Sequence, residues 1–175
     1  MSTPVHRPLR IGGALAALAA AALLAAAPAQ AAGTTSAVCV NQFTATISPG
    51  FTLIPGSGRQ TTYGETGTIA CIGKIAGHRV TGPGSSGFDM PYSGATCASE
   101  KSSGTVSVTV PTTAGDQHLV GALTVWRTAL AFRAEVQLAG MHFSGVGVDI
   151  PRQGNCFLTP LRRVTAVVTG TFSGA

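Results

Sequence analysis

Two pairs of side chains in this sequence have the types and the spacing for chemistry, and the first is His142 with Ser144. Residues two apart on a β-strand project from the same face, so this pair could act as base and nucleophile, with Glu135 or Asp149 as the acid that orients the imidazole. Ser144 has no GxSxG nucleophile motif around it, and a histidine on the same strand face as Val146 and Val148 is more often half-buried. We therefore assign no catalytic residue. A small secreted hydrolase that uses His142 and Ser144 is kept as an alternative function.

The second pair, Asp116 and His118, could bind a metal ion or relay a proton. It follows the segment Thr-Thr-Ala-Gly, which favours a solvated turn. The sequence also contains no HExxH motif, no His-x-His and no His/Cys pair at ligand spacing. Six acidic residues leave little room for the paired carboxylates of a glycosidase. We predict no metal site and no cofactor.

Four cysteines, Cys39, Cys71, Cys97 and Cys156, predict two disulfides. Their spacings of 32, 26 and 59 residues exclude the CxxC pattern of redox motifs and of most zinc sites. Three pairings are open, and we favour Cys39 with Cys71 and Cys97 with Cys156. Because all four are then paired, no cysteine nucleophile is expected.

Two stretches depart from the regular pattern of the chain, Gly50 to Gly64 and Thr81 to Ala95. The second runs from a glycine- and serine-rich segment directly into Phe88, Met90 and Tyr92. Long loops in compact domains are either functional or mobile. We expect these three side chains either to fold back over one end of the core or to form a binding loop for a ligand or partner.

Two-residue alternation from Val38 to the end of the chain predicts β-strands. Pro111 is expected to end one strand because proline cannot donate to a sheet ladder, and Gly140 is expected to turn a hairpin. The predicted inward faces carry Cys39, Phe43, Ala45 and Ile47; Val106, Val108 and Val110; Leu130, Phe132, Ala134, Val136 and Leu138; and Val164, Ala166, Val168 and Phe172.

The segment Leu119 to Trp126 also fits the apolar face of a helix, but its glycine, threonine and valine residues favour a strand. Trp126 ends an apolar run and is expected in the core. Eight to ten short strands, punctuated by Gly, Pro and Ser, predict an all-β fold. That fold is an antiparallel β-sandwich or barrel with two disulfides.

The first 31 residues have the pattern of a secretory signal peptide. Arg7 and Arg10 precede the apolar run Ile11 to Ala27, and small residues offer a cleavage site near Ala31. The run is mostly alanine and too short for a membrane span. We therefore predict a signal peptide over residues 1–31 and a single extracellular β-domain over residues 32–175.

The number and distribution of charged residues limit the classes of partner that this chain could bind. Removal of the two signal-peptide arginines leaves nine basic and six acidic side chains, a net charge of +3. The basic residues are scattered apart from Arg162 and Arg163, which argues against nucleic acid as a partner. We predict a secreted, non-enzymatic binding or cell-envelope-associated module whose partner is a protein, a cell-envelope component or a small apolar ligand. A secreted protease inhibitor is a further alternative.

The segments GTIACIGKIAG, SGATCASEKSSGTVSVTV and GNCFLTPLRRVTAVVTGTF resemble small secreted β-domain proteins of high-GC Gram-positive bacteria. The resemblance extends from Val38 to Phe172 and implies an extracellular β-fold without a particular activity. Enediyne-carrier apoproteins, which are secreted β-sandwiches, differ because their two disulfides close short loops, whereas no two cysteines here are closer than 26 residues. The secreted subtilisin inhibitors of these bacteria differ in cysteine spacing as well.

Overall fold

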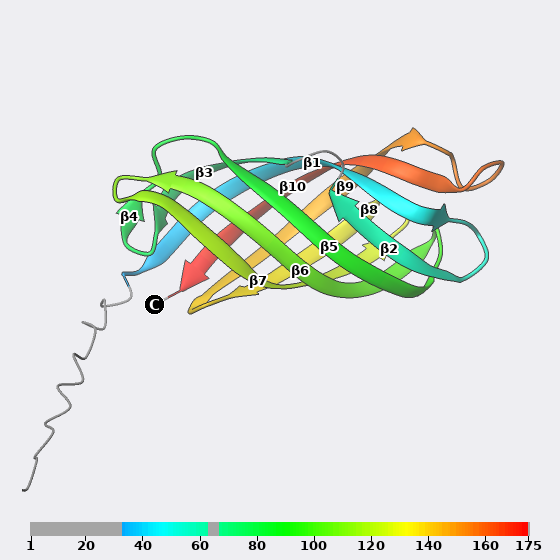
Figure 1. The fold of residues 1–175 in the computed structure, drawn as a ribbon, viewed down its shortest axis with the longest axis horizontal. Coiled ribbons are helices and arrows are strands. Elements are labelled where there is room, and N and C mark those ends of the chain that lie inside the picture. Colours follow the sequence, from blue (N-terminus) through cyan, green and yellow to red (C-terminus); the bar gives the residue numbers. More distant parts are fainter. Residues whose placement is uncertain (1–32, 63–66, 175) are drawn as a thin grey trace, which may run out of the picture.

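The computed structural model describes residues 33–62 and 67–174, and every regular element in these ranges is a β-strand (Figure 1). The predicted signal peptide and the cleavage site near Ala31 lie outside the described residues. The strands are β1 (Thr35–Phe51), β2 (Gly56–Thr62), β3 (Gly67–Ile75), β4 (His78–Arg79), β5 (Gly84–Ala95), β6 (Ser99–Thr112), β7 (Gly115–Thr128), β8 (Ala131–Leu138), β9 (Met141–Gln153) and β10 (Leu161–Gly174). No helix in these ranges is long and apolar enough to cross a membrane.

The sheet closes on itself into an antiparallel barrel. Strands β5 to β10 follow one another as neighbours, and β10 then pairs with β1, in register from Thr35 with Gly174 to Thr46 with Arg163. The predicted all-β fold is therefore confirmed, and of its two predicted forms, sandwich or barrel, it is the barrel. Several strands are longer than predicted, since β1 alone has 17 residues.

Strands β2 and β3 together occupy one position in the barrel wall, between β1 and β5. Strand β3 pairs with the first part of β1, Ser36 to Gln42, and β2 pairs with a later part, Ala45 to Ser48. Both strands also pair with β5. Strands β2 and β3 thus lie one after the other along β1, and side chains of both strands line the lumen.

The alternation predicted from the sequence is confirmed on the inward faces. All the predicted inward residues of β6, β8 and β10 are buried, as are Cys39, Ala45 and Ile47 of β1. Phe43 is half-buried, and Leu130 is exposed because it lies in the turn between β7 and β8. The segment Leu119 to Trp126 is part of β7, as predicted.

The irregular stretches predicted around residues 50–64 and 81–95 are largely strands. The first contains the end of β1 and all of β2, and most of the second is β5. Their glycines lie where strands approach closely: a Cβ at Gly84 would be 1.9 Å from the Thr109 carbonyl oxygen, and one at Gly58 would be 2.0 Å from that of Ser48. The glycines therefore allow close packing in the sheet and do not mark loops.

Pro111 does not end its strand, because β6 continues to Thr112. The carbonyl oxygen of Pro111 accepts a hydrogen bond from the Thr81 amide at 3.0 Å. A proline is tolerated where only its acceptor takes part in the ladder.

Both favoured disulfide pairings are confirmed. Cys39 and Cys71 lie directly opposite each other on β1 and β3, with a Cα–Cα distance of 4.1 Å. Cys97 and Cys156 join the β5–β6 turn to the β9–β10 connection, with a Cα–Cα distance of 6.0 Å. Two such bonds are typical of a domain stabilised for an oxidising, extracellular environment.

Candidate functional site

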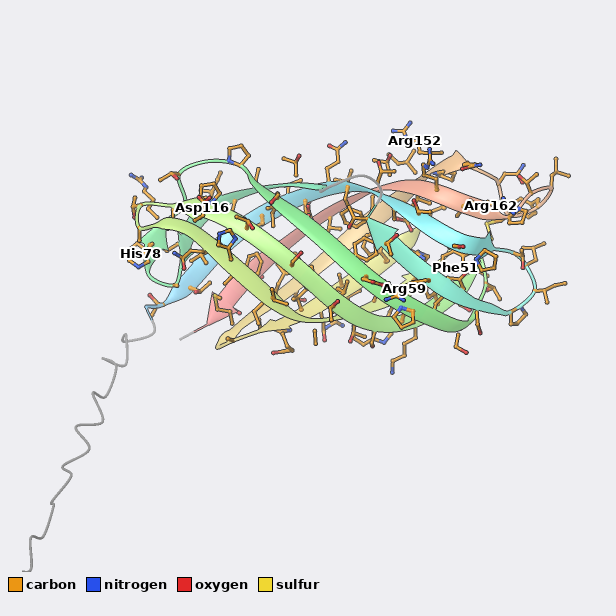
Figure 2. All side chains as sticks on the ribbon, in the orientation of Figure 1. Phe51, Arg59, His78, Asp116, Arg152 and Arg162 are labelled. Atoms are coloured by element: carbon orange, nitrogen blue, oxygen red, sulfur yellow. A yellow bond between two sulfur atoms is a disulfide. The ribbon has the colours of Figure 1, made fainter. Side chains whose placement is uncertain are left out.

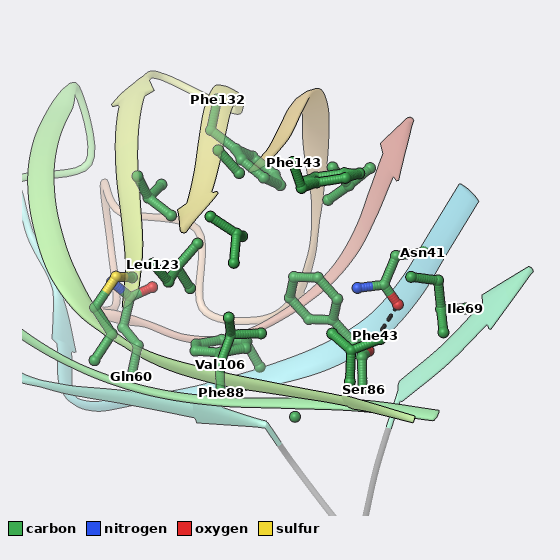
Figure 3. A pocket seen from close by; sticks show the side chains of 18 of the residues that line it. Asn41, Phe43, Gln60, Ile69, Ser86, Phe88, Val106, Leu123, Phe132 and Phe143 are labelled. Carbon is green, nitrogen blue, oxygen red and sulfur yellow. Dashed lines mark hydrogen bonds between the residues drawn. The ribbon is translucent and has the colours of Figure 1, made fainter. Parts of the chain in front are cut away.

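The lumen of the barrel contains a cavity of about 70 Å³ whose wall is mostly apolar (Figure 3). Five phenylalanines line it, together with valine, leucine, isoleucine and methionine side chains: Phe43, Phe88, Phe132, Phe143 and Phe172. Polar side chains lie on its two opposite sides. Figure 3 shows Gln60 on one side and, on the other, Asn41, whose Oδ1 accepts a hydrogen bond from Ser86 Oγ at 2.7 Å.

Inward-facing glycines explain why the rings leave space in the lumen. A Cβ at Gly147 would lie 2.5 Å from Cζ of Phe132, and one at Gly170 would lie 2.5 Å from Cζ of Phe143. The two rings therefore rest on the bare backbone of β9 and β10, an arrangement known for aromatic residues that cover glycines in β-sheets. Because the rings lie along the wall, they do not fill the centre of the barrel.

A cluster of buried polar side chains lies against the cavity: Gln60, Glu100, Ser102, Arg127 and Asp149. Both oxygens of Glu100 are used, since Oε2 accepts a hydrogen bond from Arg127 and Oε1 accepts from Gln60 and Ser102. The other carboxylate oxygen near Arg127 is Oδ2 of Asp149, 2.7 Å from Nε. The side chains of Glu100, Asp149 and Arg127 are 0%, 2% and 7% exposed, so this is a charge cluster inside the barrel.

Arg127 also separates the two apolar clusters of the core. Its guanidinium carbon lies 5.1 Å from the ring centroid of Phe51, which belongs to the smaller cluster near the Cys97–Cys156 disulfide. It lies 5.8 Å from the centroid of Phe132, which belongs to the larger one. A cation over aromatic faces is stabilised by the ring quadrupole, and this partly offsets its loss of hydration.

Asp149 is the incompletely satisfied member of the cluster. Its Oδ1 is buried and has no hydrogen-bond partner, and Arg127 Nε approaches Oδ2 without an aligned hydrogen bond. Burial raises the pKa of Asp149 above its ordinary value, and the charge of Arg127 offsets this only in part. Asp149 and Arg127 both line the cavity, whereas Glu100 does not. The cavity therefore offers one carboxylate oxygen without a partner.

The predicted chemical pairs are not brought into this site. His142 and Ser144 lie on the outer face of β9 with the exposed Val146, while Asp149 projects into the lumen. Glu135 is the cross-strand neighbour of Ser144, but its carboxylate binds Arg133. Among the described residues no hydrogen bond joins His142 to Ser144. The hydrolase alternative therefore gains no support from this geometry, and the protease-inhibitor alternative stays a prediction.

Asp116 and His118 are exposed at the beginning of β7. His118 Nδ1 is 3.0 Å from the Thr109 hydroxyl oxygen. Figure 2 places Asp116 at the end of the barrel opposite Phe51, and so away from the buried charges. No group of three or more potential metal ligands occurs in the described part of the chain.

The three residues predicted as a binding loop lie on β5. Phe88 and Met90 line the cavity, and Phe88 meets Phe43 edge to face at 5.1 Å between centroids. Tyr92 is buried against Phe51 in the other cluster, at 4.9 Å between centroids. A strand thus carries two of the three side chains into the cavity wall.

Trp126 was expected in the core, but it is half-buried on the outer face of β7. The residues before and after it on β7, Val125 and Arg127, are the buried ones. Lys101 and Arg133 lie 6.0 and 5.9 Å from its ring system. The prediction was wrong because Trp126 shares its strand face with the polar Thr124 and Thr128.

Gln60, Glu100 and Arg127 belong to this site but were not among the residues predicted from the sequence. One signal was available: Arg127 continues the inward alternation of Leu123 and Val125, which puts a charge at a core position. Comparison of the chain with protein-family models, with curated proteins and with solved structures finds no match. The cavity and the polar groups that face it are therefore the features of this chain that indicate a function.

Proposed function

We propose that this chain is a secreted, non-enzymatic binding domain that holds a small, largely apolar ligand inside its barrel. The observation that carries the proposal is the apolar cavity of about 70 Å³ in a closed, disulfide-linked barrel. Binding sites for small molecules are typically concave and apolar with a few placed polar groups. The cavity has this composition, with polar side chains on two of its sides.

The cavity has an energetic cost, which supports a role for it. Protein interiors are close-packed, and at about 24 cal/mol per Å³ a void of this volume costs roughly 1.7 kcal/mol of folding stability. A ligand that fills the void would recover part of that free energy and stabilise the folded state. The glycines beneath the Phe132 and Phe143 rings keep the space open at this cost.

The volume limits the size of the ligand. At a liquid share of about 30 Å³ per water molecule, the cavity has room for roughly two water-sized groups. A larger ligand would have to displace Met90 or Phe88, and the unbranched methionine is the more adaptable of the two. The proposed ligand is therefore a molecule of few non-hydrogen atoms.

The test uses xenon as an uncharged apolar probe, because dry apolar cavities bind it. We expect xenon to shift the methyl resonances of Leu123 and Val136, which line the cavity, in ¹³C-methyl NMR spectra of the oxidised protein. Ala134→Leu fills the lumen from β8 and should abolish these shifts. Ala131→Leu, the matched variant on the outer face of the same strand, should leave them unchanged. Absence of shifts in the wild-type protein would contradict the proposal.

A further inference from the structure

The unpartnered oxygen of Asp149 indicates the polar group of the ligand. Oδ1 is buried and has no partner, in a side chain that is only 2% exposed and lines the cavity. Buried polar atoms are nearly always hydrogen-bonded, and an exception calls for a partner that binds there. A carboxylate oxygen accepts hydrogen bonds, so the missing partner is a donor.

The charges around Asp149 indicate what kind of donor fits. The ionisable side chains of the buried cluster are two carboxylates, Glu100 and Asp149, and one guanidinium, Arg127. With both carboxylates ionised the cluster carries one negative charge in excess. Glu100 already accepts from three donors, so the excess is least compensated at Asp149. A cationic donor would balance the charge and satisfy Oδ1 together.

The remaining surface of the cavity suits an alkyl group. Apart from its polar side chains, which are Asp149, Arg127, Gln60, Asn41 and Ser86, its wall is formed mainly by apolar side chains such as Phe132, Val125 and Leu123. We infer that the cavity binds a small primary alkylamine, with its ammonium group on Oδ1 of Asp149 and its alkyl group against the aromatic wall. This inference rests on the proposed function, because it names the ligand class of the same cavity.

The experiment titrates the oxidised protein with methylammonium and, separately, with methanol, which has the same number of non-hydrogen atoms and no charge. Methyl shifts of Leu123 and Val125 report binding. We expect the amine to bind the wild-type protein more tightly than the alcohol. Asp149→Asn should weaken amine binding by about tenfold or more, as removal of a hydrogen bond to a charged group does.

Two controls keep the test decisive. Asp116→Asn makes the same substitution at an exposed position of β7 and should bind the amine like the wild type. In the wild-type protein, the Cγ resonance of Asp149 should shift with the amine, a readout that needs no variant. Equal affinity for amine and alcohol, or an unchanged Asp149 resonance, would overturn the inference and leave a bound water as the partner of Oδ1. A failure of xenon to bind would instead overturn the proposed function.

Discussion

The Arg127–Asp149 pair inside the barrel and the Arg59–Asp89 pair on its surface join the same two types of side chain. Each includes a nitrogen–oxygen distance of 2.7 Å. Their surroundings differ, since the side chains of the inner pair are 7% and 2% exposed and those of the outer pair are 65% and 42% exposed. Arg59 donates to both oxygens of Asp89, whereas Arg127 approaches only one oxygen of Asp149.

The pKa values of the two aspartates are shifted in opposite directions. Hydrogen bonds from Arg59 lower the pKa of Asp89, while burial raises the pKa of Asp149 even though a guanidinium is adjacent. Desolvation of a buried carboxylate can exceed the attraction of its partner, whereas an exposed pair loses little hydration and gains little stability. The contrast shows that burial, and not the identity of the partner, sets the energetics of each pair.

Arg127→Met is expected to lower the free energy of unfolding by the largest amount. The substitution leaves Glu100 and Asp149 buried without a counter-charge, and loss of one partner of a buried pair costs about 3 to 5 kcal/mol. Urea unfolding followed by circular dichroism measures the change. Arg59→Met is the matched surface control and should leave the unfolding midpoint nearly unchanged. Equal losses of stability in the two variants would contradict the conclusion that burial sets the energetics of each pair.

A triple variant separates the cost of an unpaired charge from the worth of the cluster. Arg127→Met combined with Glu100→Gln and Asp149→Asn removes every charge of the cluster. Breaking a buried pair is costly mainly because it leaves an uncompensated buried charge, and the triple variant leaves none. We expect the triple variant to be more stable than Arg127→Met alone by about 2 kcal/mol or more in the same unfolding experiment. A triple variant as unstable as the single one would argue that the cluster stabilises the fold through its hydrogen bonds.

The pH dependence of stability should differ between the two aspartates. The folded protein holds the Asp149 proton more tightly than the unfolded chain does, so its contribution to stability is full below pH 3.8 and declines as pH rises through the raised pKa. Asp89 has the reverse sign, and its contribution declines as pH falls below 3.8. Urea unfolding at a series of pH values measures both contributions. The loss of stability as pH rises through the raised pKa of Asp149 should be absent in Asp149→Asn. The loss of stability as pH falls below 3.8 should be reduced in Asp89→Asn. Identical profiles for the two variants would contradict both assignments.

The smallest effect is expected at the surface. Arg59→Ala should let the pKa of Asp89 return towards its ordinary value of 3.8, because the hydrogen bonds that lower it are lost. NMR titration of the carboxyl resonances measures this shift. The pKa of Asp149 serves as the internal control and should not move, since Arg59 does not contact the lumen cluster.

Local patterns predicted much of the fold and little of the site. Alternating residues such as Val106, Val108 and Val110 revealed which side of a strand is buried, because that depends only on the two-residue period. The same two-residue period puts Trp126 on the outer face with Thr124 and Thr128, and the expected core position was wrong because it followed the apolar character of the ring and not this period. Gln60 and Glu100 were not predicted as site residues, because a single polar residue in a strand does not show which residue it will bind in the folded protein.

The sequence by itself determined the strand-rich architecture and the number of disulfides, since both follow from periodicity, turn residues and an even set of cysteines. Closure of the barrel through β1 and β10, the cavity and the charge cluster were decided only by the tertiary structure. Arg127 and Asp149 come from β7 and β9, which are not neighbours in the sheet. They meet because the closed, curved wall directs their side chains into one lumen. The alternation of β7 can indicate that Arg127 faces inward, but neither strand by itself shows which residue it meets there.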